Sequence, residues 1–209
     1  MVRLVVSAVV VVAIVTGGST AATAGTPLSV RVLNLGAVSD ADLSTASAVT
    51  QAVYGAAGID LAWVRCEAPE GACDDPLKPR EVWLRIVPGA APQTVGLAPL
   101  ALGSANVDPV LKTGVMATVY VGQIARLARQ AKVHFDDLLG LVVSHELGHL
   151  LLGTVTHEPT GLMQAGWSAA ELRAGDFTES RFSDVEAAHL RAGLALRTRL
   201  QRQDVLADE

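Results

Sequence analysis

The chain has 209 residues, of which 50% are hydrophobic and 18% are charged, and its formal net charge is −5. A chain of this length and apolar content can bury the core of one domain but is short for two. The acidic balance leaves no basic stripe, which argues against nucleic acid or an anionic membrane surface as the main partner.

The first 24 residues have the three parts of a secretory signal. Arg3 provides a positive end, residues 4–15 form the apolar region, and Ala22-Thr23-Ala24 offers small residues for cleavage. An uncleaved membrane anchor is the alternative, but this apolar stretch is shorter than the roughly 20 residues that a bilayer requires. We therefore expect a signal peptide at 1–24, one domain at 25–209, a secreted or cell-envelope location, and no stable membrane insertion after cleavage.

The first half of the domain has the pattern of a strand, a helix and two further strands. Residues 28–34 alternate between apolar and polar side chains, which is typical of a strand. A start resembling a capping box at Ser39 precedes apolar residues at helical spacing up to Gly58. Strands are predicted next at 59–65 and at about 81–87. This order favours parallel strands joined by a right-handed crossover, within a mixed sheet.

Two cysteines follow the second of these strands. Cys66 and Cys73 are separated by six residues in a segment that contains proline and glycine. In an oxidising compartment such a pair most simply forms a disulfide, and two cysteines alone are too few for a thiolate zinc site. The sequence therefore predicts a disulfide that closes a small loop.

The second half of the domain is mainly helical. We predict an edge strand at 101–107, a strand at 115–121, and helices at 122–132, from Asp136 to beyond His149, from Ser168, and from Ser183. The predicted fold class is α+β, with a twisted mixed sheet of four to five strands, a central buried helix and further packed helices.

The central helix carries the pattern H-E-x-x-H at His145, Glu146 and His149. Residues four apart lie on one helix face about one turn apart, so both imidazoles can reach one metal ion while Glu146 borders the same site. Buried Glu and His are costly unless they are paired or bound to metal. With His157, three of the five histidines of the chain fall within 13 residues, so a metal site is predicted here.

Three neutral imidazoles and an open fourth position match a catalytic Zn2+ site. Glu146 is then a general base that takes a proton from water and delivers it to the leaving amine, while zinc lowers the pKa of the water and polarises the substrate carbonyl. The predicted reaction is amide hydrolysis in a peptide or protein substrate, and ester hydrolysis is compatible. We expect a monomer.

The segment from His145 to Met163 resembles the metzincin zinc endopeptidases. The shared features are the two helix histidines, Gly153 at the helix end, His157 as third ligand, and Met163 in a turn below the metal. Gly161-Leu162-Met163 is similar to the small-Leu-Met turn of the matrixins. The usual metzincin pattern is H-E-x-x-H-x-x-G-x-x-H, and here the glycine comes one residue later and the last histidine two residues later. The resemblance implies a metzincin-like α+β fold.

The expanded spacing leaves the third ligand open. In gluzincin peptidases a downstream glutamate completes the site, and Glu171 has about the right separation, with Asp176 as a weaker candidate. His134 and His189 lack any surrounding motif and are expected on the surface or at a helix end. Besides a secreted endopeptidase, an exported zinc-binding module and an amidase or esterase for small substrates are compatible with these residues.

Overall fold

A computed structural model describes residues 27–66, 73–89, 101–175 and 180–207 of this chain. The predicted signal peptide at 1–24 lies outside the described residues. Within these ranges, none of the helices is both long enough and apolar enough to cross a membrane.

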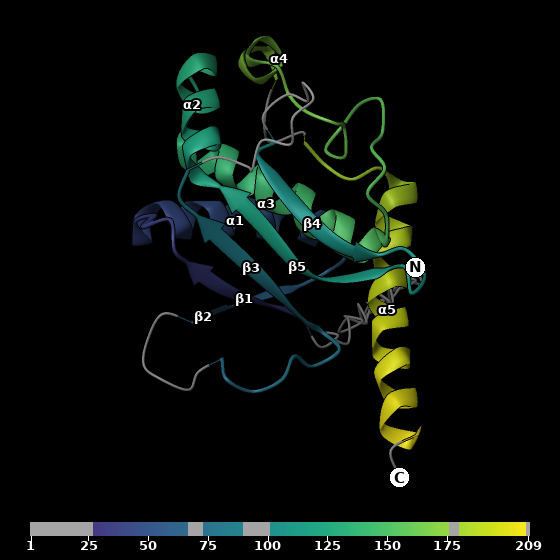
Figure 1. The fold of residues 1–209 in the computed structure, drawn as a ribbon. Coiled ribbons are helices and arrows are strands. Elements are labelled where there is room, and N and C mark those ends of the chain that lie inside the picture. The colour runs from purple at the N-terminus through teal and green to yellow at the C-terminus, as the bar shows by residue number, and fades with distance from the viewer. Residues whose placement is uncertain (1–26, 67–72, 90–100, 176–179, 208–209) are drawn as a thin grey trace, which may run out of the picture.

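Five strands form a single sheet in the order β2-β1-β3-β5-β4 (Figure 1). The strands are β1 Leu28–Asn34, β2 Leu61–Arg65, β3 Glu81–Val87, β4 Gly103–Asp108 and β5 Thr113–Tyr120. The pairs β1–β2, β1–β3 and β3–β5 are parallel, whereas β4 pairs antiparallel with β5. The mixed sheet and the edge strand predicted near 101–107 are therefore confirmed, with β4 at the edge.

The strands bury one face because apolar residues alternate along them. In β3, Val82, Leu84 and Ile86 are at most 1% exposed, and the residues between them are only half-buried. The side chains of a strand point alternately to its two faces, so these three residues form part of the core beneath the helices.

The part of the chain that the structure describes also contains five helices: α1 Asp40–Ala56, α2 Val121–Ala131, α3 Phe135–Leu152, α4 Ala169–Ala174 and α5 Asp184–Ala207. The side chain of Ser39 caps α1 by accepting a hydrogen bond from Asp42. Helix α3 packs against α1, α2, α5 and the β4–β5 side of the sheet (Figure 1), and every residue from 138 to 151 is buried. The central buried helix predicted from the apolar sequence is confirmed.

Small residues allow other helices to approach α3 closely. A Cβ atom at Gly140 would lie 2.7 Å from the carbonyl oxygen of Ala46 in α1, and the hydroxyl of Thr50 donates to the Gly140 carbonyl at 3.1 Å. On the other side, Gly193 of α5 lies against the carbonyl of Leu151. These contacts hold α3, and with it the predicted metal ligands, in a fixed position.

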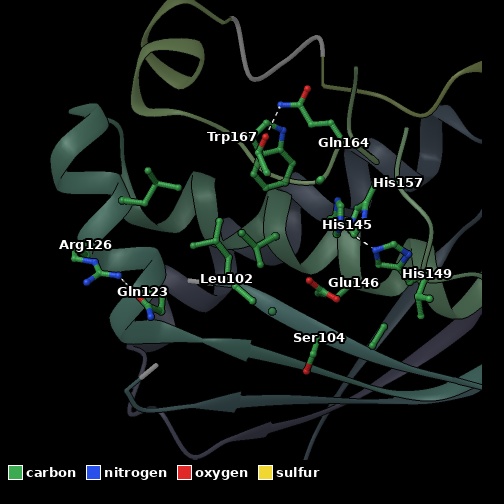
Figure 2. A pocket seen from close by; sticks show the side chains of 18 of the residues that line it. Leu102, Ser104, Gln123, Arg126, His145, Glu146, His149, His157, Gln164 and Trp167 are labelled. Carbon is green, nitrogen blue, oxygen red and sulfur yellow. Dashed lines mark hydrogen bonds between the residues drawn. The ribbon is translucent and has the colours of Figure 1, made fainter. Parts of the chain in front are cut away.

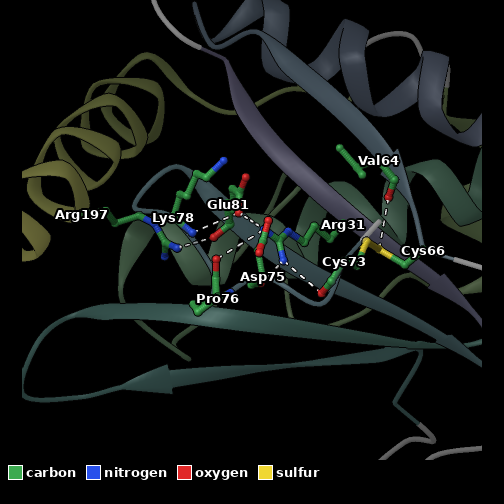
Figure 3. A network of polar contacts seen from close by, with 9 residues as sticks. All are labelled: Arg31, Val64, Cys66, Cys73, Asp75, Pro76, Lys78, Glu81 and Arg197. Carbon is green, nitrogen blue, oxygen red and sulfur yellow. Dashed lines mark hydrogen bonds and ion pairs between the residues drawn. A yellow bond between two sulfur atoms is a disulfide. The ribbon is translucent and has the colours of Figure 1, made fainter. Parts of the chain in front are cut away.

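Cys66 and Cys73 form the predicted disulfide (Figure 3). The segment that follows is held by Arg31 of β1, which is only 5% exposed. Its guanidinium donates to the Asp75 carbonyl at 2.6 Å and pairs with the Glu81 carboxylate at 2.5 Å. The disulfide and this ion pair therefore tie the segment to β1, β2 and β3, away from the histidine helix.

Candidate metal centre and its cleft

The C-terminal half of α3 presents His145, Glu146 and His149, and the helix ends at Gly153. Gly153 has a φ of 65°, in the left-handed region, and its N–H donates to the His149 carbonyl at 3.0 Å. Its Cα also faces the carbonyl of Lys112 so closely that no Cβ could be accommodated. Glycine is thus required here both by the backbone conformation and by space, and the chain reverses direction after it.

This reversal places His157 beside the two helix histidines (Figure 2). The ring centroids are 4.6 Å apart for His145 and His149, 5.3 Å for His145 and His157, and 4.9 Å for His149 and His157. One possible ligand atom from each ring lies within 4.8 Å of the others. His145 and His149 are buried, whereas His157 is exposed. The two extra residues in the motif are therefore accommodated in the turn while His157 still reaches the cluster.

Backbone carbonyls fix the tautomers of both helix histidines. Nδ1 of His145 lies 2.8 Å from the Leu162 carbonyl oxygen, and Nδ1 of His149 lies 2.8 Å from that of Thr154. A carbonyl can only accept a hydrogen bond, so each neutral ring carries its proton on Nδ1 and has a lone pair on Nε2. The Nε2 atoms are 3.0 Å apart. Two facing lone pairs at this distance repel unless a cation lies between them.

This arrangement fits zinc. Two nitrogens bound to one tetrahedral zinc at about 2.0–2.1 Å each lie roughly 3.3 Å apart, close to the 3.0 Å separation of the two Nε2 atoms. Burial also keeps both rings in the neutral form that binds metal. It lowers the pKa of His145, and burial together with the neighbouring His145 lowers the pKa of His149 to about 4.

The Glu146 carboxyl group lies between the histidine cluster and strand β4 (Figure 2). Its side chain is only 6% exposed, and burial raises its pKa to about 8. It packs directly against Gly103, where a Cβ atom would lie 2.5 Å from Oε1 and 2.7 Å from Cδ of the carboxyl group. The absence of a side chain at Gly103 thus gives Glu146 its place in the cleft wall.

Replacement of Gly103 by alanine is expected to displace the Glu146 carboxyl group while leaving the fold and the histidines in place. The Glu146 side chain is flexible, so it moves aside and the protein still folds. A misplacement of about 1 Å in a catalytic group can lower a rate by about 100-fold. For the peptidase activity that the sequence predicts, we expect Gly103→Ala to lower kcat/KM on a peptide substrate by roughly 10- to 100-fold at unchanged zinc content.

Gly166→Ala is the matched control for this substitution. Gly166 lines the same cleft, but a Cβ atom there would have no neighbour within 4 Å. The control should lose much less activity than Gly103→Ala. Equal activities of the two variants would show that contact with Gly103 does not position Glu146.

Met163 is buried beneath α3, with 1% of its surface exposed. A Cβ atom at Gly148 would lie 2.8 Å from its sulfur, so the methionine packs against the helix between the two histidine turns. Leu162, the residue before it, supplies the carbonyl that holds His145. The 161–163 turn therefore contacts α3 through Met163 and His145 through the Leu162 carbonyl.

Glu171 is engaged elsewhere. It forms a capping box with Ser168, in which the Ser168 N–H donates to its carboxylate at 2.7 Å and its own N–H donates to the Ser168 hydroxyl at 3.1 Å. Hydrogen bonding from the side chain and then from the backbone N–H of Ser168 lowers the pKa of the exposed Glu171 carboxyl group. Glu171 is not part of the histidine cluster, and Asp176 lies outside the described residues.

The two remaining histidines are exposed and separate from the cluster. His134 is the residue before α3, and His189 lies on the surface of α5. Neither belongs to the group of possible metal ligands found among the described residues.

A cleft of about 730 Å³ opens beside the histidines and Glu146. Its walls come from β4, α2, α3 and the segment around Trp167, whose ring centroid is 5.6 Å from that of His145. No sequence motif marks Leu102, Gln123, Arg126 or Trp167 as cleft residues, because they come from separate elements. The one available signal in the sequence is the helical spacing of Gln123 and Arg126, which places these two polar side chains on one face of α2.

Comparisons with known proteins give a likeness of structure alone. No protein-family model and no curated protein matches the sequence. The structure is similar to the crystal structure of archaemetzincin from Methanopyrus kandleri, with a TM-score of 0.56 and 16% identity over 83% of this chain and 99% of that one. It also matches a zinc-dependent peptidase from Methanocorpusculum labreanum, with a TM-score of 0.49 and 16% identity over 78% of this chain and 99% of that one. The likeness to archaemetzincin shows that this chain has a metzincin-like α+β fold.

Proposed function

We propose that this chain is a secreted zinc-dependent peptidase that hydrolyses peptide bonds with water activated by Glu146. The main observation behind the proposal is that the Nε2 atoms of His145 and His149 lie 3.0 Å apart, with His157 beside them and a buried carboxyl group at the wall of an open cleft. The archaemetzincin fold supports it.

The roles of the residues follow from their positions. His145, His149 and His157 would hold the metal through ring nitrogens, and the Leu162 and Thr154 carbonyls orient the first two rings. A bound zinc ion supplies a Lewis acid that polarises the substrate carbonyl and lowers the pKa of water. Glu146 takes a proton from the attacking water and delivers it to the nitrogen of the leaving amine. Met163, in a turn similar to that of the matrixins, supports the cluster from below.

Strand β4 supports an extended peptide as the substrate. It is the edge strand on the cleft side of the sheet, and Gly103, Ser104 and Ala105 line the cleft. The unpaired edge of a sheet can bind an extended peptide through main-chain hydrogen bonds, independently of the side chains of the peptide. We therefore favour cleavage within peptide or protein chains over hydrolysis of small amides or esters.

Two features support export. The first 24 residues have the pattern of a signal peptide, and the Cys66–Cys73 disulfide is typical of proteins from oxidising compartments. Export of the full chain is expected to give a secreted product that begins at Gly25, which N-terminal sequencing would detect.

Removal of the metal is expected to abolish peptidase activity. The secreted protein should contain about one zinc ion per chain by mass spectrometry, in line with a single site. It should cleave members of a mixed peptide library, lose this activity when a chelator removes the zinc, and regain it when zinc is restored. Full activity of the zinc-free protein would contradict the proposal. Bound zinc without any cleavage would indicate a zinc-binding module, and cleavage of small esters or amides alone would indicate the other alternative.

A further inference from the structure

One face of α2 forms the end of the cleft away from the histidines. Residues at positions i, i+3, i+4 and i+7 lie on the same face of a helix. In α2 these are Gln123, Arg126, Leu127 and Gln130, and all four line the cleft. Figure 2 shows Gln123 and Arg126 at this end, with Leu102 and Glu146 between them and the histidines. This end of the cleft is thus polar, whereas the wall next to it, at Leu102, is apolar.

The amide of Gln123 has an unused donor. Its side chain is 3% exposed, and its Oε1 accepts a hydrogen bond from the guanidinium of Arg126. A guanidinium can only donate, so this contact fixes which end of the amide is oxygen. Nε2 then lies buried with no hydrogen-bond partner among the described residues. Buried polar groups without a partner are rare, and an acceptor atom from a ligand would satisfy this one.

Arg126 supplies a positive charge at the same place. Its side chain is exposed, and no described carboxylate forms an ion pair with it. Apart from the histidines, Arg126 and Glu146 are the only ionisable residues among the described residues that line the cleft. The guanidinium presents further N–H donors in a planar fork that suits a carboxylate.

We infer that Gln123 and Arg126 form a subsite that binds a carboxylate of the peptide substrate. This inference rests on the proposed peptidase function and specifies its substrate class. A glutamate side chain has the chemistry that this subsite calls for, because its methylene groups are apolar like the lining residues Leu102 and Leu127 and its carboxylate can accept from both donor groups. A leucine would leave Nε2 of Gln123 without a partner, and a lysine would meet the charge of Arg126. The C-terminal carboxylate of a peptide offers the same chemistry.

The test uses peptides that are identical except at one position, which carries Glu, Leu or Lys, with the C-terminus amidated. Wild-type protein should cleave the Glu peptide with a kcat/KM at least about tenfold above that of the Leu peptide. The reason is that a leucine leaves the hydrogen-bonding groups of the subsite without a partner. Arg126→Met should remove this ratio, and Arg126→Glu should favour the Lys peptide. Arg129→Met is the control, because it removes a charge from the same helix outside the cleft. It should leave the ratio unchanged.

A second arm separates the two sources of carboxylate. Here the Leu peptide is compared with a free and with an amidated C-terminus. If the wild type prefers the free acid over the amide and Arg126→Met loses this preference, the subsite binds the C-terminal carboxylate of the peptide. A wild-type protein that prefers Leu in the amidated series and shows no preference for the free acid would overturn the inference. The inference would also be overturned if Arg126→Met left unchanged both the ratio of kcat/KM for Glu over Leu peptides and the ratio for free-acid over amidated peptides.

Binding keeps the inference testable if no peptide is cleaved. Calorimetric titration of the zinc-loaded Glu146→Gln variant with the same peptides should show tighter binding of the carboxylate-bearing ones, and added Arg126→Met should abolish the difference. Such binding without cleavage by the wild type would support the subsite while rejecting the peptidase function. Equal binding of all peptides would reject the subsite.

Discussion

Replacement of Glu146 by glutamine is expected to lower kcat/KM on a peptide substrate by roughly 10²- to 10⁴-fold, the range attributed to a general base. Glutamine has the shape of glutamate, so it fills the same space against Gly103. Its amide cannot take a proton from water, however, and the leaving amine would receive none. The histidines do not depend on this side chain for their orientation, because the Leu162 and Thr154 carbonyls provide it.

Zinc content and activity should be measured on the same preparations. The Glu146→Gln variant should bind as much zinc as the wild type while its activity is lost. Glu158→Gln is the control, because it removes an exposed carboxylate next to His157 that is not part of the histidine cluster; it should retain activity. An unchanged rate in Glu146→Gln at full zinc occupancy would exclude Glu146 as the base.

The zinc-free forms of these proteins provide a second readout. Burial raises the pKa of Glu146 from 4.5 to about 8, so the folded state holds this proton more tightly than the unfolded state. The stability linked to the protonated carboxyl group is fully present below about pH 4.5 and is lost as the pH rises through about 8. Glutamine does not titrate. The melting temperature of chelator-treated Glu146→Gln should therefore increase relative to the wild type from pH 5 to pH 8.

Most of the fold could be predicted because local patterns determine it. The alternation in 28–34 and 81–87 gave strands with the predicted bounds, and the predicted helix start at Ser39 is a real cap. The continuous apolar stretch before His145 indicated a buried helix, which α3 is on all sides. Periodicity shows which face of an element is buried, and this is sufficient to arrange helices on one mixed sheet.

The site could be predicted where one helix or one continuous motif, from His145 to Met163, contains it. His145, Glu146 and His149 share a helix, so their spacing alone indicates a common face. Gln123 and Trp167 reach the same cleft from different elements, and nothing in the sequence links them. The role of Gly103 depends on which side chain packs opposite it, which is a property of the folded sheet. The sequence also suggested Glu171 as a possible metal ligand, whereas in the structure Glu171 belongs to a capping box.

Replacement of His157 by alanine is expected to weaken zinc binding strongly. Residues that only orient a metal ligand contribute about 10- to 100-fold to affinity, so loss of a ligand should cost at least about 100-fold. Titration of zinc against a competing chelator measures this change directly. His134→Ala and His189→Ala are controls, because both histidines are exposed and lie outside the cluster. Zinc affinity should stay at the wild-type value in both.

Glu171→Ala tests the rival ligand set by the same titration. Its carboxylate accepts from the Ser168 N–H in a capping box of the six-residue helix α4. Loss of this capping interaction should appear as a small decrease in melting temperature with unchanged zinc affinity. Loss of zinc in Glu171→Ala but not in His157→Ala would instead give the ligand set of a gluzincin. The exposed position of His157 makes this comparison decisive, because truncation of an exposed side chain should cost little unless a metal ion is bound there.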